Sequence, residues 1–142
     1  MEKRFAYVND IQAIPQIRKD LEELAVQWGW PPSELKQIIL IAEELFTTTI
    51  RYAFQDEAEH QVKFILSMIN RMVVAEIIDD GIPFNPMEYN PDIQTNPAAL
   101  DEGGMGLMLI KAFSDSIDYR RAEHKNHLVI RKMIKPNLEK HE

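Results

Sequence analysis

The sequence contains no cysteine and only five glycines, and both features limit the functions that it can have. Without cysteine, the chain has no disulfide, no thiolate metal ligand and no cysteine nucleophile. No apolar run approaches the roughly 18 residues that a membrane-spanning helix needs. The N-terminal MEKRFAYVND also lacks the apolar core of a signal peptide. We therefore expect a cytoplasmic protein that does not insert into a membrane.

The chain also lacks a concentrated basic region. Its formal net charge is −7, and basic pairs such as Arg120-Arg121 and Arg131-Lys132 are scattered. Nucleic-acid-binding proteins usually present a basic surface, because contacts with phosphate supply much of their affinity. Direct binding to nucleic acid is therefore not expected. A length of 142 residues with 45% hydrophobic and 27% charged residues is typical of one globular domain, which we expect over residues 1–142.

Two helices are predicted near the N-terminus, after a short strand at residues 4–9. Helical spacing is seen over residues 14–30, and Gly29 is expected to end this first helix. Glycine favours a helix end, and the Pro31-Pro32 pair cannot continue the helix. The second runs from about residue 34 to residue 54, with Ser33 as its N-cap. Helical spacing predicts core-facing stripes in both, formed by Ile17, Leu21, Leu24, Ala25, Leu35, Ile38, Ala42, Leu45 and Thr49.

The second half of the chain reads mainly as two hairpins. Apolar, β-branched runs at 61–69 and 72–79 are separated by a short turn, and strands at 116–123 and 127–134 are joined about His124-Lys125-Asn126. Between the hairpins lie a long stretch rich in Pro, Asn and Asp and a helix at 106–115. The order of elements predicts an α+β fold, a two-layer sandwich in which helices cover one face of a mostly antiparallel sheet.

Four of the five glycines fall in two places. Gly81 lies in DDG at the end of a predicted strand, while Gly103, Gly104 and Gly106 form GGMG just before a predicted helix. Glycine allows close approach of the backbone to a ligand, and a helix N-terminus favours phosphate. Each motif alone is also ordinary turn chemistry. The sequence has neither a P-loop nor the glycine pattern of a dinucleotide-binding strand and helix.

Three stretches taken together and in order are more specific than any one of them. They are EELFTTTIRYAF on a helix, DDGIPFNP after a strand, and EGGMGLMLIKAF opening a helix behind a long loop. This set resembles the ATP-binding domain shared by gyrase, MutL and sensor histidine kinases, known as the Bergerat fold. It looks most like the stand-alone branch that contains the anti-sigma-factor serine kinases of bacteria. The resemblance covers nearly the whole chain and implies ATP as the ligand.

The resemblance implies a catalytic role for Glu44, which would act as the general base toward the attacking hydroxyl. Four residues later the family has an asparagine that binds Mg²⁺, but this chain has Thr48. A threonine hydroxyl can ligate Mg²⁺, as it does in P-loops. Alternatively, it can pack in the interior or bond to a carbonyl one turn earlier. Both readings of the threonine run at residues 47–49 remain open from the sequence.

The other two motifs would bind the nucleotide. By resemblance, Asp79 accepts a hydrogen bond from the adenine amino group, and Gly81 leaves room for the ring. The N–H groups around Gly104, Gly106 and Leu107 would meet the phosphates. Residues from about 87 to 103 resemble the family's ATP lid.

Two functions follow from this assignment. The first is an anti-sigma-factor-type serine/threonine protein kinase, whose partners would be a small antagonist protein that it phosphorylates and a sigma factor. The second is a degenerate, non-catalytic binding module with weak or Mg²⁺-independent nucleotide binding, which the threonine at position 48 favours. A homodimer is a further expectation from the resemblance. A two-component histidine kinase is disfavoured, because the N-terminal helices contain no histidine to accept phosphate.

Overall fold

The structure is a computed structural model that describes residues 1–88 and 104–136. Its elements, in chain order, are β1 (Glu2–Val8), a 3-10 turn η1 (Ile11–Ala13), α1 (Ile14–Trp28), α2 (Pro32–Tyr52), β2 (Gln61–Ile69), β3 (Met72–Asp79), a 3-10 turn η2 (Pro86–Glu88), α3 (Gly104–Phe113), β4 (Ser116–Ala122) and β5 (Lys125–Met133).

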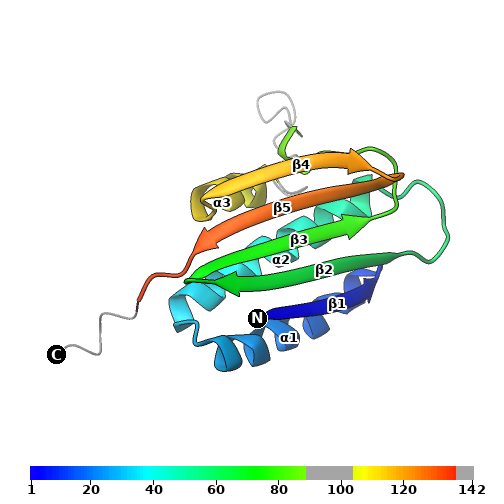
Figure 1. The fold of residues 1–142 in the computed structure, drawn as a ribbon. Helices are drawn as coiled ribbons and strands as arrows, with labels where there is room; N and C mark the ends of the chain where they lie inside the picture. Colours follow the sequence, from blue (N-terminus) through cyan, green and yellow to red (C-terminus); the bar gives the residue numbers. More distant parts are fainter. Residues whose placement is uncertain (89–103, 137–142) are drawn as a thin grey trace.

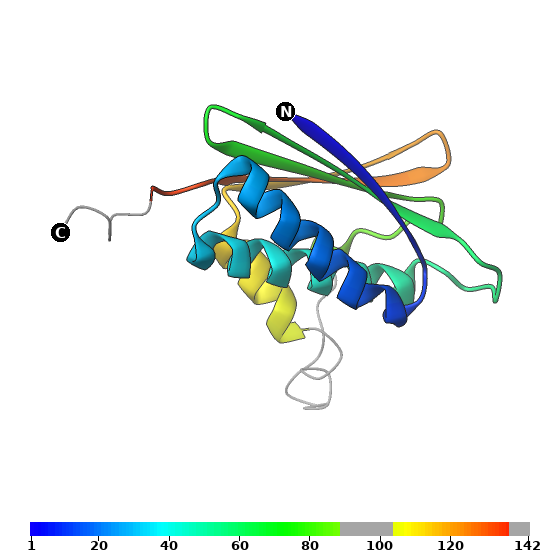
Figure 2. The ribbon, with the colours of Figure 1, turned by 90° about the horizontal axis from the view of Figure 1, so that it is seen from below.

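The five strands form one sheet in the order β1-β2-β3-β5-β4, and every neighbouring pair is antiparallel (Figure 1). Figure 2 shows α1, α2 and α3 together on one side of this sheet. The predicted α+β sandwich with helices on one face is confirmed. The C-terminal end of β3 lies near the C-terminal end of α2. A hydrogen bond joins the two ends, from Ile82 N–H, after β3, to the carbonyl of Ala53, the C-cap of α2, at 2.8 Å.

The core lies between the helices and the sheet. Helix α1 buries Ile17, Leu21, Leu24 and Ala25, the face that its spacing predicted. Gly29 ends α1 in the left-handed region at φ 74°, and its N–H donates to the Ala25 carbonyl. The predicted stripe of α2 also faces the core, although Leu35 is only partly buried. None of the helices in the described ranges is long and apolar enough to cross a membrane.

The start of α2 differs from the prediction. The helix begins at Pro32, with extended Pro31 in the N-cap position and no side-chain cap, so Ser33 is exposed inside the first turn rather than capping it. Proline suits the first turn because its missing N–H would have no helical partner. The adjacent Glu34 is buried and forms an ion pair with Lys132 Nζ of β5 at 3.0 Å.

The two hairpins turn through residues with positive φ. Asn70 and Arg71 join β2 to β3, and Glu123 and His124 join β4 to β5. The closing turn was predicted about residues 124–126, which is wrong by one to two residues. A two-residue turn with both φ angles positive matches the twist of the flanking strands. As a result, Asn126 lies within β5, directly opposite Asp79 of β3.

Candidate functional site

Helix α2 places Glu44 against the start of α3. Glu44 is half-buried, and a Cβ atom added to Gly106 would collide with its carboxylate and would lie 2.6 Å from its Cγ. Only glycine at position 106 therefore leaves the carboxylate where it is. Two motifs that are distant in the sequence are therefore in direct contact.

The surroundings of Glu44 raise the affinity of its carboxylate for a proton. Burial raises the pKa of Glu44 above its ordinary value, the negative charge of Glu43 raises it further, and Arg51 opposes both effects. Glu43 is itself paired with Arg18 of α1, whose Nη2 lies 2.5 Å from Glu43 Oε1. A carboxylate with a raised pKa is a stronger proton acceptor, so these surroundings suit Glu44 to general-base chemistry.

Asp79 ends β3 in a buried position, with 6% of its surface exposed. Its Oδ1 accepts hydrogen bonds from Gly81 N–H at 2.9 Å and from Asn126 Nδ2 at 2.8 Å. Burial raises the pKa of Asp79, and these two hydrogen bonds oppose the rise. Both bonds fall on Oδ1, and within residues 1–88 and 104–136 no hydrogen bond is made to Oδ2. One oxygen is fixed by the protein while the other can accept from a ligand.

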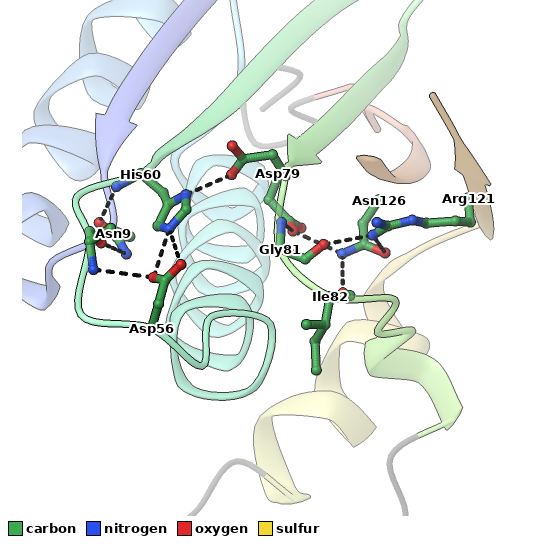
Figure 3. Close-up of polar contacts among 10 residues, drawn as sticks. Asn9, Asp56, His60, Asp79, Gly81, Ile82, Arg121 and Asn126 are labelled. Carbon is green, nitrogen blue, oxygen red and sulfur yellow. Dashed lines mark hydrogen bonds and ion pairs between the residues drawn. The ribbon is translucent and has the colours of Figure 1, made fainter. Parts of the chain in front are cut away.

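Asn126 organises this end of the sheet, a role that the sequence analysis did not predict (Figure 3). Its Nδ2 also donates to the Ile82 carbonyl at 2.8 Å, while its Oδ1 accepts from Phe84 N–H at 3.2 Å and from Tyr119 Oη at 2.5 Å. Arg121 Nη1 donates to the same Oδ1 at 3.2 Å and to the Gly81 carbonyl at 2.7 Å. These bonds fix the segment that follows Asp79.

Comparison with known proteins places this arrangement in a family. A family model described as "Histidine kinase-like ATPase domain" matches residues 7–132. The chain belongs to the histidine kinase-like ATPase domain family. The resemblance predicted from the three motifs is thereby confirmed, and the description of the family implies ATP as the nucleotide.

Two curated proteins are similar to this ATPase domain along most of its length. The serine/threonine-protein kinase BtrW of Bordetella bronchiseptica is 25% identical over 111 residues, which are 78% of this chain and 78% of the relative. The anti-sigma F factor of Oceanobacillus iheyensis is 24% identical over 126 residues, which are 88% of this chain and 85% of the relative.

A solved structure supports the fold. The histidine kinase domain from the blue-light activated histidine kinase of Erythrobacter litoralis matches with a TM-score of 0.54 and 18% identity. The match covers 73% of this chain, which spans 46% of the length of that structure. At this identity the likeness concerns the arrangement of helices and strands in the ATPase domain.

The threonine run in α2 has two structural explanations. Thr47 Oγ1 lies 2.9 Å from the Glu43 carbonyl and 3.1 Å from that of Glu44, so it bonds to its own helix. Thr48 and Thr49 are buried, with 3% and 4% of their surfaces exposed. Thr47 therefore bonds back to its own helix, while Thr48 and Thr49 lie in the interior.

The ligands for a protein-held Mg²⁺ do not fit at Thr48. Mg²⁺ prefers oxygen ligands in octahedral geometry and usually binds through carboxylates, phosphates and water. Position 48 offers one neutral hydroxyl on a side chain that is almost fully buried. In the part of the chain that the structure describes, no group of three His, Asp or Glu residues could hold a metal ion. No chemical step is therefore assigned to a metal bound by Thr48.

The other residues predicted to bind nucleotide lie at the start of α3, after β3 and in the predicted lid. Gly104 begins α3, and Leu107 is buried in the core with 4% exposure, so only its backbone N–H is suited to a phosphate. A Cβ at Gly81 would collide with the backbone of Ala53, so this glycine permits packing against the end of α2. Residues 87 and 88 lie in η2, and the rest of the predicted lid, 89–103, lies outside the described residues.

Proposed function

We propose that the chain is an ATP-dependent serine/threonine protein kinase and a regulator of the anti-sigma-factor type. The observation that carries the proposal is the contact between Glu44 and Gly106. It sets a proton acceptor beside the N-terminus of a helix, where backbone N–H groups and the helix dipole favour phosphate. The two curated relatives, a serine/threonine kinase and an anti-sigma factor, support the same reading.

In this proposal the chain's residues divide the work of phosphoryl transfer. The free oxygen of Asp79 accepts from the adenine amino group, and the backbone from Gly104 to Leu107 holds the phosphates. Glu44 accepts the proton of a serine hydroxyl as its oxygen forms a bond to the γ-phosphorus. The bond from that phosphorus to the β-phosphate oxygen breaks, and ADP leaves. Such transfers depend chiefly on positioning and charge stabilisation.

The partner we propose is a small antagonist protein that presents the acceptor serine, with a sigma factor as the alternative partner. Both would place the chain in the cytoplasm, where transcription occurs. The anti-sigma F factor among its relatives supports this choice of partner.

The proposal is tested by replacing Glu44 with glutamine. The variant should still bind ATP in calorimetry but should lose phosphoryl transfer from radiolabelled ATP to an antagonist protein recovered as the chain's binding partner. Glu22→Gln, on the exposed face of α1, is the matched control and should retain transfer. Full transfer by the Glu44 variant would refute the role of this carboxylate.

A second candidate function is a nucleotide-binding module without catalysis. The burial of Thr48, which stands in place of the family's metal-binding asparagine, favours it. The two candidates differ in their dependence on Mg²⁺. ATP binding that strengthens with Mg²⁺ supports the kinase, because the metal would then be held largely by phosphate oxygens and water. Binding indifferent to Mg²⁺ supports the module, and Thr48→Asn should then create a dependence on the metal.

A further inference from the structure

A second polar cluster lies beside the proposed nucleotide site, on the side of Asp79 away from Asn126 (Figure 3). His60, just before β2, has its Nδ1 3.0 Å from Asp80 Oδ1. Its Nε2 lies 2.8 Å from Asp56 Oδ1 and 3.1 Å from Oδ2. We call these three residues the His60 clasp. It joins the loop after α2 to the segment that follows β3.

The geometry of the clasp favours a protonated histidine. Carboxylate oxygens accept hydrogen bonds but do not donate, and a neutral imidazole has only one N–H. Because both ring nitrogens face carboxylates, both contacts are hydrogen bonds only when the ring is an imidazolium. The hydrogen bond to Asp56, followed by the contacts with Asp80, raises the pKa of His60 above its ordinary value, although desolvation opposes the rise. The bond to His60 lowers the pKa of Asp56.

The ring is held in this position from several sides. It stacks on Phe54, with ring centroids 4.6 Å apart and an interplanar angle of 21°. The backbone is fixed too, because His60 N–H donates to Asn9 Oδ1 at 2.8 Å and Asn9 N–H donates to the His60 carbonyl at 2.9 Å. Asp80 and Asp56 are therefore brought to a ring that is already positioned.

Other charged groups surround the clasp without reaching the ring. Among the described residues, only the two clasp carboxylates lie within hydrogen-bonding distance of the ring nitrogens. The charged side chains that line the two adjoining surface hollows, besides the clasp itself, are Glu59, Lys63, Asp79, Lys125 and Arg121. The clasp is thus the direct link between the proton on His60 and the segment at Asp80.

We propose that protonated His60 is a positioning residue for nucleotide binding, which holds Asp79 and Gly81 in their binding geometry through Asp80. The inference rests on the proposed nucleotide site. Asp80 lies between these two residues, and the far side of the segment is fixed by Arg121, which donates to the Gly81 carbonyl. A neutral ring keeps one N–H, which we expect on Nε2, because Nε2 lies 2.8 Å and 3.1 Å from the two carboxylate oxygens of Asp56. The hydrogen bond to Asp80 is then lost, which releases one side of the segment and leaves the other attached. Nucleotide binding therefore weakens as the pH rises, while the fold persists.

The experiment compares ADP binding by the unmodified protein, His60→Gln and His124→Asn. His124 is the matched control, because it lies exposed in the β4–β5 turn. Calorimetry at about pH 6 and about pH 8.5 brackets the range in which histidines titrate. The unmodified protein and the control should bind ADP at least about fivefold more weakly at the higher pH. A fivefold change in affinity is about the smallest effect usual for two coupled binding events. His60→Gln should bind weakly at both.

An NMR titration supplies a readout that a merely structural role would not change. Coupling between two binding events is reciprocal, so ADP should raise the pKa of the His60 ring. Either of two results would overturn the role of His60 and leave the proposed function standing. One is a His60→Gln variant with unchanged ADP affinity and pH dependence. The other is a His60 ring that titrates identically with and without ADP. If the unmodified protein bound no ADP at either pH, the proposed function would fail with it.

Discussion

Replacing Asn126 with alanine should loosen the whole segment after β3. The side chain donates to Asp79 Oδ1 and to the Ile82 carbonyl, both at 2.8 Å, and accepts from Phe84 N–H and Tyr119 Oη. Alanine supplies none of these bonds. Among residues 1–88 and 104–136, the carboxylate of Asp79 would then accept a hydrogen bond only from the backbone of Gly81.

The size of the effect follows from the kinds of bond that are lost. A hydrogen bond to a charged group contributes about 2 kcal/mol and a neutral one about 1 kcal/mol, less where water can replace the partner. Water can partly replace the bonds to the Ile82 carbonyl and from Phe84 N–H. We therefore expect Asn126→Ala to lower the free energy of unfolding by about 3 kcal/mol. This is a large share of the roughly 5–15 kcal/mol by which a domain is stable.

Urea unfolding at neutral pH measures this loss. With a slope of about 1–3 kcal/mol per molar urea, a loss of about 3 kcal/mol should lower the unfolding midpoint by about 1–3 M. Tyr119→Phe, which removes one donor to the same Oδ1, should cost about 1 kcal/mol. The matched control is Asn85→Ala, because in the described part of the chain its side chain accepts one local hydrogen bond, from Met87 N–H at 3.0 Å. If Asn126→Ala cost no more than the control, the network would not be what holds the segment.

Three further predictions concern other parts of the structure. Gly81→Ala should cost about 1–3 kcal/mol in thermal denaturation, because its methyl group would collide with the backbone of Ala53; an unchanged melting temperature would contradict that packing. Lys132→Met should cost about 3–5 kcal/mol in urea, because it leaves Glu34 buried and unpaired, and adding Glu34→Gln should restore most of the loss. Burial raises the pKa of Asp79 in the folded state, so its contribution to stability is present at acid pH and is lost as the pH rises through the folded-state pKa. Asp79→Asn should therefore make stability less dependent on pH above about pH 4, where the carboxyl begins to ionise in the unfolded chain. An unchanged slope would argue against a carboxyl whose pKa is raised by folding.

The sequence by itself determined the elements whose signals are local. Hydrophobic spacing defined the buried face of α1, Gly29 ended that helix in the left-handed region, and the apolar runs predicted the first hairpin. Together with the three motifs, this was enough for the α+β fold and the family. Local signals were less reliable at boundaries: the predicted N-cap Ser33 lies inside α2, because Pro32 already begins the helix.

Only the tertiary structure decided which side chains meet. Glu123 and His124 are unusual residues for a turn with two positive φ angles, so the register predicted for the closing hairpin was wrong. In a strand, a shift of one residue moves every side chain to the other face of the sheet. The role of Asn126 opposite Asp79 was therefore invisible in the sequence. The same holds for His60, whose two carboxylate partners are brought together by separate loops.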